Sequence, residues 1–251
     1  MSDATAEFVT HGHIDAGDPL RDFISAEHLT DEALADLGRW HSQRPWQPRV
    51  YRNFLIDDVA RSVGAVLRSL PVWSRCATVY RGTQETEEIN EPDWADHPDR
   101  AACHFVARPL LDVFQPDAMD AASQTALKRF LSFAVIRGDL RTWISAGIGF
   151  PLEKRTSVEL ACYRDGDQIR PHQDLFPGRV LAVNFYLDES YKTGTGARLG
   201  FRNEAGDEFH VDPVFNTFSL IPIDSECEHW VEPFTGEGTG RHTVSIGEHQ
   251  A

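Results

Sequence analysis

The most restrictive feature of this sequence is a change of hydrophobic period near residue 150. Beyond that point apolar and polar residues alternate with a period close to two, and Gly, Pro and Asp interrupt the pattern at short intervals. Alternate side chains of a strand face opposite sides of a sheet, so this period predicts half-buried β-strands. Eight such segments suggest a jelly roll. They are 156–163, 168–173, 179–187, 197–202, 207–211, 217–223, 227–231 and 241–246.

Residues 1–150 show helical periodicity in place of this alternation. In the segment 117–135, apolar residues recur at the i, i+3, i+4 and i+7 spacing of one helix face. The predicted helices are 26–40, 57–70 and 117–135, with strands at 49–55 and 77–81 between them. We expect one α+β domain over 1–251 with a mainly β core. In it, 1–150 supplies helical support and a possible lid, and 151–251 forms a cupin-like double-stranded β-helix.

Composition excludes several classes of partner. The formal net charge is −15, from 24 basic and 39 acidic side chains, and such a field repels nucleic acid. No apolar run approaches the roughly 20 residues that span a bilayer, and the first residues do not resemble a signal peptide. The four cysteines form no CxxC pair, which fits free thiols in a reducing compartment. We therefore expect a cytoplasmic protein without nucleic-acid or membrane partners. The oligomeric state stays open.

Four residues in order point to metal chemistry. His172 and Asp174 are two apart and would project from the same side of an extended strand. His229 follows 55 residues after Asp174, and Arg241 lies 12 residues beyond His229. Two histidines and one carboxylate can occupy one face of Fe(II) and leave three positions open. A buried arginine flanked by a hydroxyl such as Thr243 is suited to binding a carboxylate through two hydrogen bonds.

This order resembles that of the Fe(II)/2-oxoglutarate-dependent dioxygenases, and within them the prolyl-hydroxylase-like group. The matching stretches are LACYRDGDQIRPHQD (160–174), VNFYLD (183–188), HWVEP (229–233) and GRHTVS (240–245). The resemblance implies iron bound by His172, Asp174 and His229. It also implies a 2-oxoglutarate co-substrate whose distal carboxylate binds Arg241, with Tyr163 as a further contact.

Other positions carry weaker or competing interpretations. Thr243 and Asn184 are further candidate contacts of the co-substrate, and Tyr163 and Asn184 are equally compatible with ordinary buried side chains. Cys227 is two residues from His229, so it would project from the same side of a strand, and it is a minor candidate ligand. The sequence departs from relatives at Gly196–Leu199, where two glycines and an acid are usual, so the role of this loop is open.

Two further histidine motifs compete with the chosen set. His210-Val-Asp212 is a second HxD, but only 17 residues separate Asp212 from His229, too few to return across a barrel. His11 and His13 lie in a polar N-terminal stretch and are not expected to bind metal. The acidic segment 82–100 is expected to be a solvated loop, with a mobile lid over an amine-bearing substrate as the alternative.

The resemblance implies an oxygenase that consumes O2 and 2-oxoglutarate, releases succinate and CO2, and hydroxylates an unactivated C–H bond. Related halogenases lack the carboxylate that stands here as Asp174, so hydroxylation is favoured over halogenation, while desaturation or ring formation stays open. The expected substrate is an amino acid, a peptidyl or carrier-tethered residue, or a natural-product intermediate. Two alternatives remain: an iron enzyme of the same fold that does not use 2-oxoglutarate, with Arg241 binding the substrate's own carboxylate, and a non-catalytic jelly-roll binding protein.

Overall fold

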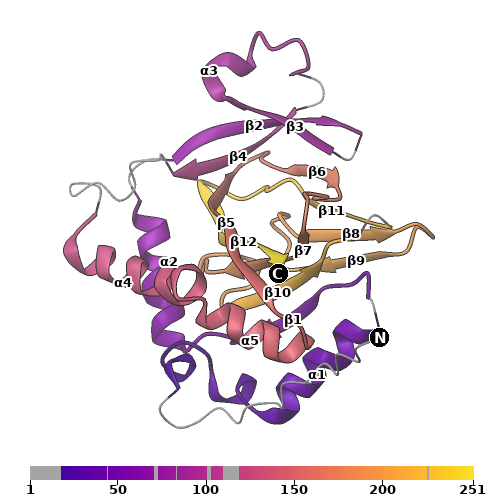
Figure 1. Ribbon diagram of the computed structural model, residues 1–251. Coiled ribbons are helices and arrows are strands. Elements are labelled where there is room, and N and C mark those ends of the chain that lie inside the picture. Colours follow the sequence, from indigo (N-terminus) through magenta and orange to yellow (C-terminus); the bar gives the residue numbers. More distant parts are fainter. Residues whose placement is uncertain are drawn as a thin grey trace.

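Two antiparallel sheets face each other in the C-terminal half of the chain (Figure 1). The larger contains β5 (Leu152–Arg164), β7 (Arg179–Tyr186), β10 (Thr217–Pro222) and β12 (Thr239–Gln250). The smaller has the order β6-β11-β8-β9, from β6 (Ile169–His172), β8 (Leu199–Asn203), β9 (Glu208–Val211) and β11 (Cys227–Val231). All eight strands expected after residue 150 form, and the predicted double-stranded β-helix is confirmed.

The computed structural model describes residues 18–43, 45–70, 73–82, 84–100, 103–109, 119–224 and 226–251. His11 and His13 lie outside these ranges, as do the first two residues of the segment 117–135.

Strands from the first half of the chain extend the larger sheet, whose order is β1-β10-β7-β12-β5-β4-β2-β3. They are β1 (Arg49–Arg52), β2 (Trp73–Arg81), β3 (Gln84–Asn90) and β4 (Cys103–Pro109). The expectation of a solvated loop over 82–100 is therefore wrong, because β3 pairs with β2 and is followed by the short helix α3 (Glu91–Trp94). The sequence pattern did not indicate this strand, because it is rich in glutamate and Ile89 is its one apolar residue. In the structure Ile89 packs with Ala77 and Val79.

Helices cover the outer face of the larger sheet. They are α1 (Asp31–Ser42), α2 (Asp57–Ser69), α4 (Ala121–Leu131) with its π-helical continuation Ser132–Ile136, and α5 (Asp139–Ile148), preceded by 3-10 turns at Pro19–Asp22 and Ala26–His28. Thr30 accepts a hydrogen bond from the Ala33 amide and caps α1, as its sequence signal predicts. Helix α5, bounded by the left-handed Gly138 and Gly149, was not predicted. None of the described helices is long and apolar enough to cross a bilayer.

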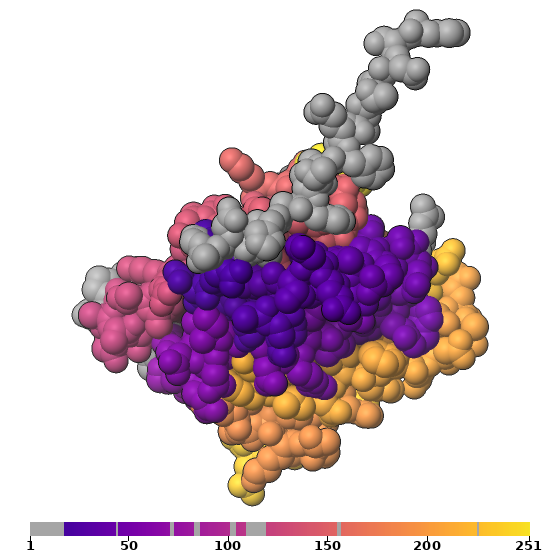
Figure 2. Space-filling model, turned by 90° about the horizontal axis from the view of Figure 1, so that it is seen from below, coloured from indigo at the N-terminus to yellow at the C-terminus, as the bar shows by residue number. Residues whose placement is uncertain are grey.

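Because side chains alternate along each strand, one face of the larger sheet packs against the helices and the other faces the smaller sheet. In β7, Leu181, Val183 and Phe185 pack into the core formed with the helices. Their neighbours Ala182 and Asn184 line a cavity between the two sheets. Seen from below, residues of the first third of the chain, in indigo and purple, occupy the middle of the surface, and residues near 200, in orange, lie along its lower edge (Figure 2). The helical layer thus closes one face of the sheet and leaves the other to form a site.

Candidate metal centre

The two candidate histidine ligands lie opposite each other on adjacent strands of the smaller sheet. His172 ends β6, and it is paired in register with His229 of β11. Their ring centroids are 4.2 Å apart. Because residues paired directly across antiparallel strands project from the same face, the topology brings together two imidazoles that are far apart in sequence.

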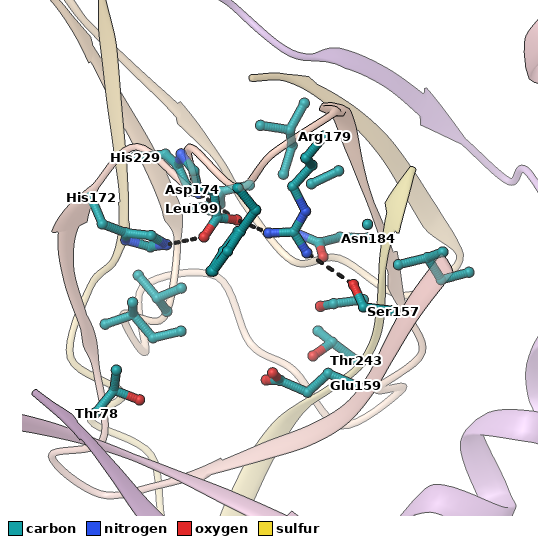
Figure 3. Close-up of a pocket in the computed structure, with 18 of the residues that line it drawn as sticks. Thr78, Ser157, Glu159, His172, Asp174, Arg179, Asn184, Leu199, His229 and Thr243 are labelled. Atoms are coloured by element: carbon teal, nitrogen blue, oxygen red, sulfur yellow. Dashed lines mark hydrogen bonds and ion pairs between the residues drawn. The ribbon is translucent and has the colours of Figure 1, made fainter. Parts of the chain in front are cut away.

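Asp174 joins them by a route that differs from the one expected. The strand ends at His172, and Asp174 has a φ of 55°, in the left-handed region. An aspartate tolerates this conformation better than most residues. The turn points the carboxylate between the two imidazoles, with Oδ1 3.5 Å from His172 Nε2 and Oδ2 3.6 Å from His229 Nε2 (Figure 3). The expectation that an extended strand would align His172 with Asp174 is therefore wrong, although the two side chains do meet.

The three side chains can share one ion. One ligand atom from each lies within 4.8 Å of the others. His172 Nδ1 is 2.7 Å from the carbonyl oxygen of Arg170, so that nitrogen donates its proton and Nε2 is left to bind a metal. The arrangement matches a facial set of two histidines and one carboxylate. That these residues are the iron ligands stays a prediction.

The electrostatics of the cluster favour the protonation states that a divalent cation needs. Burial, together with the neighbouring His229, lowers the pKa of His172 to about 4. Burial alone would raise the pKa of Asp174, but the hydrogen bond and charge of His229, with His172 and Arg179, hold it well below its usual range. The carboxylate is therefore ionised and His172 is neutral at pH 7.

Arg179, which the sequence did not single out, supports the carboxylate. Its Nη1 lies 2.9 Å from Asp174 Oδ2, and its Nη2 donates to Ser157 Oγ at 3.1 Å (Figure 3). A Cβ on Gly247 would come within 2.3 Å of Arg179 Nη2, so the guanidinium can cross β12 only because residue 247 is glycine. The sole sequence signal is an arginine at the start of a predicted strand, which is too common to be specific.

Arg241 lies at the closed end of the same cavity. Its φ is 49° and the strand register shifts around it, so a β-bulge turns its side chain inward. The guanidinium carbon is 4.6 Å from the ring centre of Tyr163 and 5.4 Å from that of Tyr186. Burial raises the pKa of Tyr163 to about 12, so its hydroxyl stays protonated. Tyr186 was not predicted, because strand aromatics are usual core residues.

Two polar atoms at this end have no partner among the described residues of the protein. Arg241 is 3% exposed and its Nε makes no hydrogen bond, and the buried Thr243 Oγ1 makes none either. Buried donors without partners are rare in folded proteins. A guanidinium and a hydroxyl left open in a cavity fit the carboxylate of an elongated acid such as 2-oxoglutarate, so the residues present are suited to both the metal and the co-substrate.

The cavity between these groups has a volume of about 630 Å³, within the usual range for a small-molecule site. The predicted residues His172, Asp174, His229, Arg241, Tyr163, Thr243 and Asn184 all line it. Asn184 Nδ2 donates to the Tyr186 hydroxyl at 3.4 Å. From the first half of the chain, Thr78 and Tyr80 of β2 and His104 and Arg108 of β4 complete the wall. These four were missed because their strands were missed or only partly predicted.

The competing residues lie elsewhere. His210 Nε2 is 3.3 Å from Glu232, and Asp212 accepts a hydrogen bond from the Tyr191 hydroxyl at 3.2 Å, so the second HxD serves other contacts. Cys227 Sγ contacts the Trp46 carbonyl oxygen at 3.5 Å and is not part of the cluster. In the atypical loop, Arg198 forms two 2.7 Å hydrogen bonds to Glu232.

The fold and the side chains together form a candidate metal site inside a double-stranded β-helix. Residues 158–246 match the model of the 2OG-Fe(II) oxygenase superfamily, a segment that covers well under half of the chain but contains all three candidate ligands and Arg241. The segment is therefore similar to a 2OG-Fe(II) oxygenase domain, and this superfamily works with Fe(II), 2-oxoglutarate and O2.

Solved structures show the same fold over most of the chain. A prolyl-4-hydroxylase from Pseudomonas putida is similar with a TM-score of 0.57 and 19% identity, over 87% of this chain and 99% of that one. A prolyl hydroxylase from Trichoplax adhaerens, in complex with a hypoxia-inducible-factor peptide, gives 0.57 and 16%, over 88% and 94%. The epimerase SnoN of nogalamycin biosynthesis gives 0.55 and 13%, over 86% and 83%. A search of curated protein sequences gives no match.

Proposed function

We propose that this protein hydroxylates an unactivated C–H bond of an amino acid, a peptidyl or carrier-tethered residue, or a natural-product intermediate, and releases succinate and CO2. The observation that carries the proposal is the pairing, within one cavity, of the cluster His172, Asp174 and His229 with the buried, partly unsatisfied Arg241. A metal cluster alone is compatible with many reactions. A buried guanidinium at the closed end of the same cavity selects for a dicarboxylic co-substrate.

In this proposal each residue has a separate task. His172, Asp174 and His229 would hold Fe(II), which together with 2-oxoglutarate and O2 supplies the oxidising chemistry. The Arg170 carbonyl fixes the tautomer of His172, and Arg179 fixes the Asp174 carboxylate through Oδ2. Arg241 would bind the distal carboxylate of the co-substrate, with Thr243 as a second donor.

Tyr163 and Asn184 complete the proposed co-substrate pocket. The Tyr163 ring lies against the Arg241 guanidinium and limits its orientations, while its protonated hydroxyl is a possible donor to a carboxylate. Asn184 is held by its contact with the Tyr186 hydroxyl. Aliphatic side chains between these groups, including Leu199, Ile221 and Val231, exclude water around the methylene groups of a bound acid.

The proposal is tested by iron content and succinate release. His172→Ala and His229→Ala should each lose iron, since removing a ligand costs more than the roughly 10- to 100-fold loss that follows a change beside a ligand. His210→Ala removes the histidine of the competing motif and serves as the matched control, with unchanged iron content. Succinate release from 2-oxoglutarate, screened across amino acids, peptides and carrier-bound acyl groups, then reports turnover. Iron retained in both ligand variants contradicts the proposal.

A second candidate is favoured by one comparison. SnoN, a non-heme α-ketoglutarate-dependent epimerase, has the same fold as this chain, so this fold serves a reaction other than hydroxylation in that protein. Mass analysis of the product distinguishes the two. Hydroxylation adds one oxygen atom, whereas epimerisation leaves the mass unchanged.

A further inference from the structure

The cavity contains a carboxylate that neither the metal nor the co-substrate uses. Among the described residues that line it, the only carboxylates are Asp174 and Glu159. Asp174 belongs to the candidate metal cluster and is bound by Arg179. Glu159 contacts neither His172 nor His229, and it lies on a different sheet from them. Its presence inside a site for a dianionic co-substrate needs an explanation, because an acid there repels that co-substrate.

Glu159 occupies the part of the cavity where the primary substrate must lie. Along the inward face of β5, Tyr163 and Ala161 are buried, Glu159 is half-buried and Ser157 is exposed. The closed end of the cavity is therefore at Tyr163 and the mouth at Ser157. Glu159 points into the cavity from the side opposite His172 and Asp174 (Figure 3). A molecule that enters through the mouth and reaches the metal cluster passes this carboxylate.

The charges around Glu159 leave an excess of negative charge. Its partner is Arg108, whose Nη2 is 3.2 Å from Oε2, but the other terminal nitrogen of Arg108 is bound to Glu88. One guanidinium thus serves two carboxylates. Burial raises the pKa of Glu159, the charges of Glu88 and Asp174 add to that shift, and those of Arg108 and, more weakly, Arg179 oppose it. The group is short of positive charge, and a cation beside it would be stabilised.

The same surroundings disfavour an anionic substrate group at this place. Both terminal nitrogens of Arg179 are used, one by Asp174 and one by Ser157. Both terminal nitrogens of Arg108 are used by Glu88 and Glu159. Only Nε of each arginine lacks a partner among the described residues, and because the Nη2 beside it is used, neither arginine offers the open two-nitrogen fork that a carboxylate binds best. Next to Glu159, in register on β12, stands Ser245, whose hydroxyl oxygen can accept a further hydrogen bond.

We infer that the primary substrate bears a protonated amine that binds the Glu159 carboxylate, with the Ser245 hydroxyl as a second acceptor. This inference rests on the proposed oxygenase function and adds the chemical class of the substrate. An ammonium donates up to three hydrogen bonds and carries the charge that the Glu88–Arg108–Glu159 group lacks. Holding the amine at Glu159, across the cavity from the metal cluster, would place the carbon skeleton of the substrate between them.

The experiment compares free L-amino acids without a second amine with their N-acetyl derivatives. Anaerobic addition of 2-oxoglutarate to the Fe(II)-loaded enzyme, followed by its visible band, tests the oxygenase function alone. Succinate release and ligand-induced thermal shift then test the amine. The thermal shift needs no turnover, so it reports binding of the amine even if 2-oxoglutarate produces no visible band. We expect amines to stimulate succinate release and raise the melting temperature, and their N-acetyl partners to do neither.

Variants of Glu159 test whether this residue causes the preference for free amines over their N-acetyl derivatives. Glu159→Gln keeps the size of the side chain and should raise the KM for the amine roughly 10- to 100-fold, as expected for loss of a charge-assisted hydrogen bond. Its 2-oxoglutarate band should persist. Glu159→Asp keeps the charge and should retain the discrimination against the acetylated partner. Glu208→Gln, at an exposed position of β9 outside the cavity, is the matched control and should change nothing.

Three results overturn the inference. The first is equal response to free and acetylated partners. The second is a Glu159→Gln enzyme that discriminates as the unmodified enzyme does, which would leave Glu159 only the structural role of holding Arg108. The third is a panel in which no amine raises either the melting temperature or succinate release. Failure of the 2-oxoglutarate band, with amines still bound, would refute the proposed function and not the amine site.

Discussion

Replacement of Arg241 by methionine tests the assigned co-substrate site most directly. Methionine keeps much of the length and apolar character of the arginine stem but removes the guanidinium. In the protein without ligand that guanidinium is 3% exposed and its Nε has no hydrogen-bond partner. Its removal therefore breaks no hydrogen bond of Nε, and the ring contacts with Tyr163 and Tyr186 can be replaced by apolar packing. We expect little change in melting temperature.

Co-substrate affinity should respond very differently. Truncating one partner of a buried, hydrogen-bonded charge pair typically costs about 2–5 kcal/mol. At about 1.4 kcal/mol per factor of ten, this range raises the Kd for 2-oxoglutarate roughly 30-fold to several-thousand-fold. Arg241→Lys keeps the positive charge but loses the planar two-nitrogen fork, so its loss should be intermediate. The stability and the affinity of the methionine variant should thus change independently.

Anaerobic titration of 2-oxoglutarate into the Fe(II)-loaded variants, followed by the visible charge-transfer band, measures this Kd. Arg202 provides a matched control, because its guanidinium carbon also lies over an aromatic ring, at 5.6 Å from Trp230, but outside the cavity. Arg202→Met should bind 2-oxoglutarate normally. A Kd within about threefold of the unmodified value in Arg241→Met refutes the reasoning. It would instead support binding of the substrate's own carboxylate by Arg241.

Two further predictions concern stability. Burial, opposed by Arg141, raises the pKa of Glu248 to about 7, from 4.5. A carboxyl with a higher pKa in the folded chain binds its proton more tightly there, so the free energy of unfolding should fall by up to about 3 kcal/mol between pH 4.5 and 7. Glu248→Gln should remove this dependence in urea unfolding at pH 5 and 8, and parallel pH curves would contradict the assignment. In α2, a Cβ on Gly64 would lie 2.2 Å from the Leu187 carbonyl oxygen. Gly64→Ala should therefore destabilise the protein by about 1–2 kcal/mol despite its better helix propensity, whereas Ser62→Ala on the exposed side of the helix should not.

The C-terminal half of the fold was predictable because its signals are local. Most strands of the jelly roll are short and bounded by turn residues, and those of the larger sheet have helices on one face and the cavity on the other, so alternation survives in the sequence. In β7, for example, Val183 and Phe185 face the helical core while Asn184 faces the cavity. The helices 26–40 and 57–70 were recognisable for the same reason, since each buries one face.

Strand β3 lacks such a signal. It carries six charged or polar residues beside Ile89, and its stability comes from pairing with β2 and from ion pairs such as that of Glu88 with Arg108. Tertiary contacts that a local pattern does not contain therefore decide its structure.

Helix α5 is a different case. Its buried residues Leu140, Trp143, Ile144 and Ile148 recur at the spacing of one helix face. A local signal was therefore present, and the prediction missed it.

The residues of the candidate site also fall into a predictable and an unpredictable group. Its ligand histidines and Arg241 could be proposed because their order along the chain is informative. Arg179 could not, because its contact with Asp174 depends on the turn after β6 and on the space left by Gly247. The left-handed conformation of Asp174 was equally out of reach, since an aspartate after a strand has no preferred direction until the two imidazoles are in place.

The part of the chain that matches the oxygenase superfamily is not the part that closes the cavity over the candidate metal cluster. Residues 158–246 contain the candidate ligands and Arg241, whereas Tyr80 and His104 come from the extra strands β2 and β4. The Tyr80 ring packs at 5.4 Å from His172, and His104 Nδ1 accepts a hydrogen bond from the Arg170 amide at 3.3 Å, so this wall also braces a candidate ligand. Arg108 of β4 reaches Glu159 from the same side. Substrate choice should therefore depend on residues 73–109 as well as on the family segment, because the family segment carries the candidate metal cluster and the added strands shape the space beside it. This chain shares its fold with prolyl hydroxylases and an epimerase, so its own substrate has to be sought in the contacts of Glu159 and Arg108.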